Sequence, residues 1–163
     1  MCGHGTRSID TMILTVEVDK TIRRPIDNVR RQFGDMRHHE KYRVHPDVQF
    51  TVLSEEGNAC RFRQEVSVLG MSQVDEVYQL RQPNGDIVSD VVAGSNRGMH
   101  IIQSFRSEGG GATAIHFRLD MPISGIKRLL KPLFAAALRK AIEKGLEEDR
   151  IDLEERGYPR TAA

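Results

Sequence analysis

Asp149 lies where a solvated carboxylate is not expected, in the middle of an apolar stripe near the C-terminus. The stripe follows one helical face at a spacing of mostly three or four residues and comprises Phe134, Leu138, Ile142, Gly145 and Leu146. At about 100° per residue, Asp149 projects close to the centre of this face. An inward carboxylate must be paired, hydrogen-bonded or bound to a cation. Asp149 is therefore either a structural ion-pair partner near a helix end or part of a site, and a second cluster far upstream favours a site: Asp35, His38, His39 and His45.

The overall composition narrows the classes of function. The chain has 163 residues, which suits one domain that buries roughly two-thirds of its unfolded surface and can enclose a pocket. Lys and Arg number 24 and Asp and Glu 23, so the formal net charge of +1 provides no long-range attraction to nucleic acid or to an anionic membrane. Neither partner is expected.

Cysteine usage and hydropathy predict a cytoplasmic protein. Cys2 and Cys60 are the only cysteines, one in an N-terminal stretch and one in a predicted strand, which argues against a disulfide framework. No apolar segment of the kind found in signal peptides opens the chain, and nowhere do about 18 apolar residues run together. We expect a flexible leader over residues 1–11, one domain over 12–158 and a flexible tail over 159–163.

Hydrophobic periodicity predicts an α+β architecture. Residues 12–19 alternate and are rich in β-formers, whereas Pro25 opens a short helical stretch that ends near Phe33. Six further strands, separated by Asn- and Gly-containing turns, are expected at 47–54, 59–68, 72–82, 86–93, 98–107 and 112–121. Such an antiparallel meander has to bury one face, and only the last helix is long enough to cover it. Pro132 is expected to divide that helix into a short approach, 126–130, and a main segment of about 24 residues.

Alternation assigns the strand side chains to the two faces of the sheet. The predicted inward set comprises Phe62, Gln64, Val66, Val68, Val74, Glu76, Tyr78, Leu80, Met99, Ile101, Gln103, Phe105, Ile115, Phe117 and Leu119. His100 and His116 have the opposite parity and are expected on the outer face. Gln64, Glu76 and Gln103 interrupt the apolar inner face, which is typical of a cavity lining. The alternative is that these three hydrogen-bond one another or lie at a sheet edge.

The order of elements resembles that of the START-like, or SRPBCC, superfamily, which includes polyketide cyclases, lipid-transfer domains and allergens of the birch-pollen type. The resemblance covers Met12 to Tyr158, and the opening TVEVDKTIRRPIDNVRRQFGDMRHHEKY is similar to the family's strand, Pro-containing turn and helix pair. It implies a helix-grip fold, in which a curved sheet of about seven strands wraps around a long C-terminal helix. A hydrophobic cavity is left between the sheet and the helix. Function varies widely within this superfamily, so the fold alone decides little.

A local resemblance points to one branch, the catalytic domain of Rieske-type oxygenases. FGDMRHHEKYRVHP is similar to that branch's Asp-x-x-His followed by a second His, and EEDRIDLEERGYP resembles its C-terminal carboxylate helix. The resemblance implies an Fe(II) site with His38 or His39, His45 and Asp149 as ligands and Asp35 as a bridging acid. Six residues separate His38 from His45 and five separate His39 from His45, where the family usually has four. The chain has no Cys–His pattern for a Rieske cluster, so the iron would need a separate electron-donor protein; descent without the metal is the alternative.

Two functions follow from these observations. The first is binding of a hydrophobic small molecule, aromatic, polyketide or lipid-like, without a cofactor and with Glu76 and Asp35 as candidate acid/base residues. The second is a non-haem iron enzyme that uses the ligands named above. A partner-binding module is a third reading of the charged last turns. The predicted ligand-binding residues are Phe62, Gln64, Val66, Val74, Tyr78, Ile101, Gln103, Phe117, Leu138 and Ile142.

Overall fold

The computed structural model describes residues 11–68 and 71–160 of the chain. Its strands are β1 (Met12–Ile22), β2 (Val48–Glu56), β3 (Ala59–Val68), β4 (Met71–Arg81), β5 (Ile87–Gly94), β6 (His100–Gly109) and β7 (Ala112–Ile123). Its helices are α1 (Ile26–Gly34), α2 (Met36–Tyr42), α3 (Ile126–Leu129) and α4 (Lys131–Ile151), followed by a π-helical segment, η1 (Asp152–Gly157). The strands form one open antiparallel sheet in the order β1-β7-β6-β5-β4-β3-β2.

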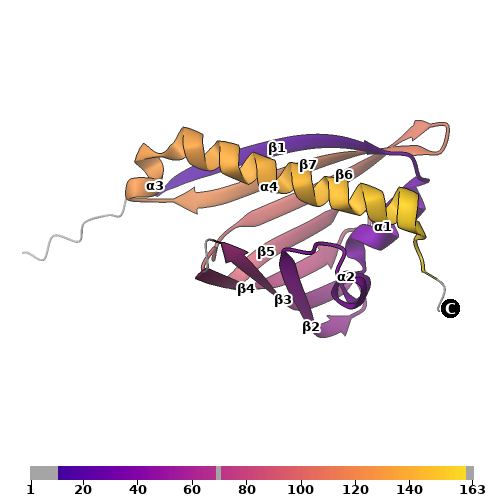
Figure 1. The fold of residues 1–163 in the computed structure, drawn as a ribbon, viewed down its shortest axis with the longest axis horizontal. Coiled ribbons are helices and arrows are strands. Elements are labelled where there is room, and N and C mark those ends of the chain that lie inside the picture. Colours follow the sequence, from indigo (N-terminus) through magenta and orange to yellow (C-terminus); the bar gives the residue numbers. More distant parts are fainter. Residues whose placement is uncertain (1–10, 69–70, 161–163) are drawn as a thin grey trace, which may run out of the picture.

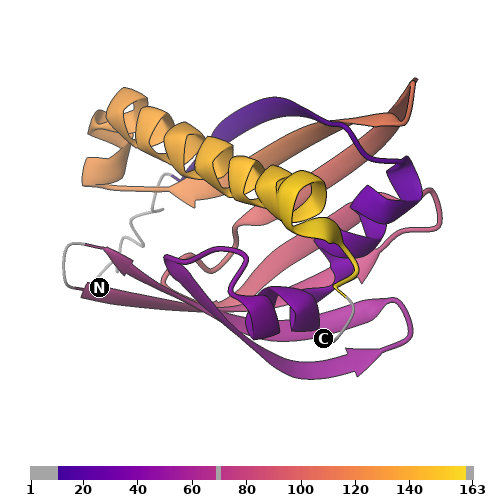
Figure 2. The ribbon, with the colours of Figure 1, turned by 45° about the vertical axis from the view of Figure 1, so that its right-hand side comes forward.

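The sheet curves around α4, while α1 and α2 close one end beneath the last turns of that helix (Figures 1 and 2). Among the strands, α4 packs most closely against β1. Ile142, Leu146 and Asp149 recur at spacings of four and three residues on one face of the helix, and all three are buried, so this face points inward. No helix of the described part of the chain is long and apolar enough to span a membrane.

The core lies between the concave face of the sheet and the helical segments α1, α2, α4 and η1. Leu14, Ile22 and Ile115 are at most 1% exposed, and Leu153 of η1 is fully buried. Leu146, at 2% exposure, joins α4 to the same apolar cluster. The C-terminal half of the long helix is therefore fixed in place by packing, which sets the direction of its inward carboxylates.

The predicted helix-grip architecture is confirmed. Each of the seven predicted strands is found within three residues of its expected ends. Pro132 lies in the first turn of α4, as expected for a residue without a backbone N–H, and α3 precedes it. The predicted segment of about 24 residues is divided between the 21-residue α4 and η1. Most of the predicted leader, residues 1–10, and residues 161–163 of the predicted tail lie outside the described part.

The prediction of the inner face is right for the described side chains of β3, β6 and β7 and wrong for β4; the side chain of Val68 lies outside the described part. The buried residues of β4 are Asp75, Val77 and Gln79, whereas Val74 and Tyr78 are 39% and 41% exposed. Pairing with β3 places Glu76 opposite Arg63, on the outer face, where it forms an ion pair with Arg61. Glu76 is therefore not a wall of the cavity.

The inward polar residues of β4 are tolerated because most of their polar atoms have partners. Asp75 accepts hydrogen bonds from the backbone N and the Nδ2 of Asn96, at 2.8 and 2.7 Å, and Gln79 Nε2 donates to Met36 Sδ at 3.8 Å. Alternation predicts that Val74 and Tyr78 face inward because their face of β4 has more apolar residues. It does not show that the polar residues of the other face are hydrogen-bonded and can therefore be buried.

Leu146→Ala is expected to lower the free energy of unfolding by about 2–5 kcal/mol, because the side chain is nearly fully buried in the core. Leu129→Ala removes the same atoms from a side chain that is 83% exposed and is expected to stay within about 0.5 kcal/mol of the parent. Urea denaturation of both variants measures the difference. Equal stabilities would contradict the packing of α4.

Candidate functional site

A cavity of about 530 Å³ lies between α4 and the strands β3, β6 and β7; we call it the main cavity. Its helix wall includes Leu138, Ala141 and Ile142, and its sheet wall includes Ile101 and Phe117. Gln64 and Gln103 are the uncharged amide groups on the sheet side. An apolar cavity with a few polar groups is typical of small-molecule sites.

A smaller hollow of about 190 Å³, the inner pocket, extends the same region toward α1 and α2. Phe33, Phe50 and Phe62 line it, together with residues that also line the main cavity: His45, Gln64, Ile101, Gln103, Phe117 and Asp149. Because the linings overlap, the main cavity and the inner pocket are adjoining parts of one site with His45 and Asp149 on their shared wall.

Three residues from distant segments meet at this wall. His39 lies on α2, His45 in the loop before β2 and Asp149 on α4, and one ligand atom from each lies within 4.8 Å of the others. Asp149 Oδ1 is 3.1 Å from His39 Nε2 and 3.5 Å from His45 Nε2. Arg43 ends α2 in the left-handed conformation (φ 47°), which turns the chain so that His45 faces α4.

The other ring nitrogens of both histidines are already hydrogen-bonded. His39 Nδ1 donates to the backbone carbonyl of Asp35 at 2.8 Å, and His45 Nδ1 donates to Glu148 Oε2 at 2.8 Å. In the neutral imidazoles the lone pairs are therefore on the Nε2 atoms, which face Asp149. A lone pair and a carboxylate oxygen repel each other, so a proton or a cation must lie between them.

Charge stabilises the ionised form of the cluster. Burial by itself would raise the pKa of Asp149, but the neighbouring His45 and the hydrogen bond to His39 outweigh it and hold that pKa below its usual range. Burial would lower the pKa of His45, but Asp149 and the hydrogen bond to Glu148 raise it. The cluster is thus a buried carboxylate held by cationic or polar neighbours.

A second buried cluster lies one helical turn further along. Asp152 is fully buried and accepts hydrogen bonds from His38 Nε2 at 2.7 Å and from Arg160. Gln32 of α1 joins the two clusters, because its Nε2 donates to Asp149 Oδ1 at 3.0 Å and to Asp152 Oδ2 at 3.2 Å. Adjacent histidines on α2 therefore have different partners, and the sequence alternative between His38 and His39 is decided in favour of His39 beside Asp149.

Asp35 does not bridge the cluster through its carboxylate. Oδ1 accepts the backbone N–H of His38 at 2.9 Å, which caps α2, and Oδ2 accepts the hydroxyl of Tyr158 at 2.8 Å. Its contribution to His39 is made by the backbone carbonyl instead. The role of Asp35 as a bridging acid stays a prediction, since in this structure its two oxygens accept hydrogen bonds from the start of α2 and from Tyr158.

Eight of the ten predicted ligand-binding residues line the main cavity or the inner pocket: Phe62, Gln64, Val66, Ile101, Gln103, Phe117, Leu138 and Ile142. Val74 and Tyr78 lie on the outer face with Glu76. The sequence reasoning missed Gln32, Glu148 and Asp152. Gln32 follows the buried Val29 by three residues and Asp152 follows Asp149 by three, so helical periodicity could have identified both.

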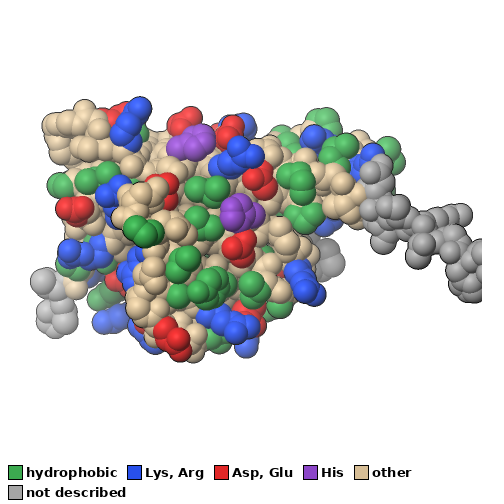
Figure 3. Space-filling model, turned by 180° about the vertical axis from the view of Figure 1, so that it is seen from behind, with side chains coloured by type: hydrophobic (Ala, Val, Ile, Leu, Met, Phe, Trp, Pro, Cys, Tyr) green, Lys and Arg blue, Asp and Glu red, His purple; other side chains and the backbone are tan. Residues whose placement is uncertain are grey.

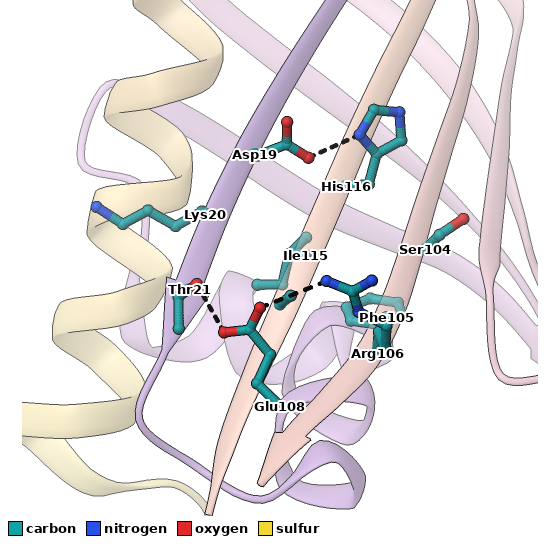
Figure 4. A pocket seen from close by; sticks show the side chains of 10 residues that line it. Asp19, Lys20, Thr21, Ser104, Phe105, Arg106, Glu108, Ile115 and His116 are labelled. Atoms are coloured by element: carbon teal, nitrogen blue, oxygen red, sulfur yellow. Dashed lines mark hydrogen bonds and ion pairs between the residues drawn. The ribbon is translucent and has the colours of Figure 1, made fainter.

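A third hollow, of about 460 Å³, lies on the outer face of the sheet (Figure 4). There His116 Nδ1 donates to Asp19 at 2.8 Å, and Glu108 lies between Thr21 and Arg106. His100, also predicted to lie outside, pairs with Asp90. The charged side chains of this face are spread over the surface and largely solvated (Figure 3), so the hollow has no buried polar group to orient a ligand.

Residues 14–148 match the family described as "Polyketide cyclase / dehydrase and lipid transport". Among solved structures, the protein TTHA0849 from Thermus thermophilus is similar over 86% of this chain and 99% of its own, with a TM-score of 0.73 and 20% identity. The Zhui aromatase/cyclase from Streptomyces sp. R1128 is similar over 90% of this chain and 99% of its own, with a TM-score of 0.71 and 13% identity. A START superfamily protein from Mycobacterium smegmatis is similar over 86% of this chain and 99% of its own, with a TM-score of 0.68 and 17% identity.

These likenesses confirm the START-like fold, while the similarity to Rieske-type oxygenases stays a prediction. No curated protein matches the chain by sequence.

Asp152→Asn is expected to lower the free energy of unfolding at pH 7 by about 3–5 kcal/mol, because it leaves the buried His38 and the partly buried Arg160 without their anion. Burial would raise the pKa of Asp152, but the hydrogen bonds from His38 and Arg160 outweigh burial and hold that pKa below its usual value. Its stabilisation is therefore complete above the unfolded pKa and is lost as the pH falls through the lower folded pKa. Urea denaturation at pH 7, 5 and 3.5 should show the gap between parent and variant narrowing only below about pH 4.

The matched control for that experiment is Asp90→Asn, which removes the carboxylate of an exposed His–Asp pair. Its stability is expected to stay within about 1 kcal/mol of the parent at each pH. A constant gap for Asp152→Asn across the three pH values would contradict the assignment.

Proposed function

This chain belongs to the polyketide cyclase/dehydrase and lipid transport family, and we propose that it binds a hydrophobic small molecule in the main cavity and the inner pocket. The observation that carries the proposal is a lining of aliphatic and aromatic side chains beside a polar wall. Burial of an apolar ligand there contributes roughly 25 cal/mol per Å² of apolar surface removed from water.

The shape of the site favours a ligand with one apolar body and one polar end. Phe50, Phe62 and Phe117 provide ring faces and edges in the interior. Gln64 and Gln103 can each donate and accept hydrogen bonds, and the His45–Asp149 wall provides the charged end. An aromatic or polyketide-like molecule with oxygen substituents matches this distribution better than a plain alkyl chain does.

If a reaction occurs on the bound molecule, the acid/base groups are not those expected from the sequence. Glu76 is excluded by its place on the outer face, and the Asp35 carboxylate is occupied by Tyr158 and the start of α2. His45 and Asp149 are the titratable groups that line both the main cavity and the inner pocket. They are the groups we propose for cyclase-like proton transfer.

A second candidate function is that of a metal-dependent enzyme, and the geometry of His39, His45 and Asp149 favours it. Ligands at about 2.1 Å from one metal ion lie roughly 3.0–3.4 Å apart in octahedral or tetrahedral geometry. The Asp149 oxygen is 3.1 and 3.5 Å from the two Nε2 atoms, so small side-chain movements suffice. Both Nδ1 atoms donate to oxygens, as in metal sites where such bonds fix the tautomer.

Two imidazoles and one carboxylate on one side of an ion are typical of non-haem Fe(II), and they leave coordination positions open for dioxygen and substrate. In this role Glu148 and the Asp35 carbonyl orient the two rings, while Gln32 holds the carboxylate. Because His45 and Asp149 line both the main cavity and the inner pocket, an ion held by them would lie beside a bound ligand. Electrons would come from a separate donor protein, as expected from the sequence.

Ala141→Trp tests the cavity. Ala141 lines the main cavity from an exposed position on α4, so the indole blocks the space without replacing a core residue. We expect at least a tenfold loss in affinity for 1-anilinonaphthalene-8-sulfonate and the loss of any small molecule retained in native mass spectrometry. Ala136→Trp, on an exposed position outside the lining, is the control. Equal binding by both variants would contradict the proposed location.

His39→Ala tests the metal site. We expect anaerobically purified parent protein to bind one Fe(II) or Co(II), and His39→Ala to lose at least tenfold in affinity. Glu148→Gln should weaken binding about 10–100-fold, because it removes the partner that orients His45. His116→Ala, a histidine paired with Asp19 on the outer face, is the control. Metal analysis and the visible spectrum of Co(II) are the readouts, and a parent that binds neither ion rules out the second function.

A further inference from the structure

The end of the molecule that carries α3 exposes an unusual amount of apolar surface. Ile126 is 72% exposed, Leu129 83%, Leu130 46% and Leu133 68%. These four residues follow one another at spacings of three, one and three, so they form one stripe across α3 and the start of α4. We call them the α3 patch. Large exposed apolar side chains that lie together mark interaction sites.

The start of α4 is apolar on two faces. Phe134, Ala135 and Leu138 pack inward against the core cluster, while Leu133 points to solvent. A surface helix usually has one apolar stripe and a polar face opposite it. The outward apolar face is therefore not explained by the folding of this domain.

Basic residues surround the α3 patch. Residues 121–142 contain Lys127, Arg128, Lys131, Arg139 and Lys140 and no acidic residue. Since the whole chain has a net charge of only +1, the remainder is net negative. Residues 121–142 thus combine positive charge with exposed hydrophobic side chains. The net charge of the whole chain conceals this basic segment, so a value near zero does not by itself exclude an anionic partner.

We propose that the α3 patch docks on the surface of an anionic phospholipid membrane. Ile126, Leu129 and Leu133 enter the boundary between headgroups and acyl chains, and the surrounding Lys and Arg side chains contact lipid phosphates. This is peripheral binding, in keeping with the lack of a membrane-spanning helix in the described residues.

Charge and shape favour a membrane over other occupants. A second copy of the chain in a two-fold dimer would bring this basic end against itself, which places like charges together. An acidic peptide needs a groove, but the helix residues that line the main cavity begin only at Leu138, beyond the patch. A fluid lipid surface needs no complementary groove.

Docking at this end has a consequence for the main cavity. Leu138 and Ala141 lie about 8–12 Å along the helix axis from Leu133. The helix that docks is therefore also one wall of the cavity, so a docked molecule holds that wall close to the lipid. The inference goes beyond the proposed function and does not depend on it, because vesicle binding is measured without a cavity ligand.

The test is co-sedimentation of the full chain with vesicles of phosphatidylcholine alone or of phosphatidylcholine and phosphatidylglycerol in equal parts. We expect binding only to the anionic vesicles, and weaker binding at 0.5 M than at 0.1 M salt. Leu129→Glu with Leu133→Glu should abolish it. Lys127→Gln with Lys131→Gln should weaken it about fivefold per charge.

Two controls separate the patch from general effects. Leu53→Glu makes the same chemical change at an exposed leucine of β2, and Lys41→Gln removes a positive charge on α2; both should bind as the parent does. Ala141→Trp should also bind vesicles normally, which separates docking from failure of the cavity. Three results would overturn the proposal. They are a parent protein that does not bind anionic vesicles, an equal loss of vesicle binding in Leu53→Glu, and a dimer in sedimentation that dissociates in Leu129→Glu.

Discussion

Two carboxylates on the inner face of the C-terminal helix, Asp149 and Asp152, determine how the closed end of this molecule is assembled. Both are almost fully buried, and a buried carboxylate without partners costs several kcal/mol. Their partners come from other segments: Gln32 from α1, His38 and His39 from α2. The need to satisfy these charges therefore joins α1 and α2 to a helix far away in the sequence, and the loop that carries His45 joins at the same point. The interactions that complete the fold at this end are the ones that build the polar wall of the site.

The rest of the interior is shaped by the incomplete filling of the concave face of the sheet. The helix α4 packs against β1, but the concave face formed by the later strands is only partly filled, so Ile101 and Phe117 face Leu138 across open space. A close-packed interior has few voids larger than a water molecule, and a cavity of about 530 Å³ is well above that size. The space is maintained because the sheet is wide and strongly curved while a single helix covers it (Figure 2). A ligand in the main cavity would make dispersion contacts with these lining side chains.

The molecule thus has three functional regions along one helix. Its last turns carry the buried polar cluster, its middle lines the cavity, and its first turn completes the α3 patch with Leu133. A rigid helix of 21 residues connects them over about 30 Å. The cavity lies between a polar wall and an amphipathic end, an arrangement that suits a ligand with one oxygenated and one apolar end. The acid/base and metal proposals both use His45 and Asp149, and the metal proposal adds His39, whose Nε2 also faces Asp149.

Local rules in the sequence determined the strands, the order of elements and the inward direction of Asp149, because side-chain periodicity depends only on nearby backbone geometry. Tertiary structure decided the rest. The β4 strand has polar residues on both faces, and the face with Asp75 is the buried one, where Asn96 satisfies its carboxylate. His38 and His39 are neighbours about 100° apart on a helix, so which one reaches Asp149 depends on how α2 packs under α4. The partners of Asp149 and Asp152 come from distant segments, and local side-chain periodicity does not show which donor reaches which of these two acceptors.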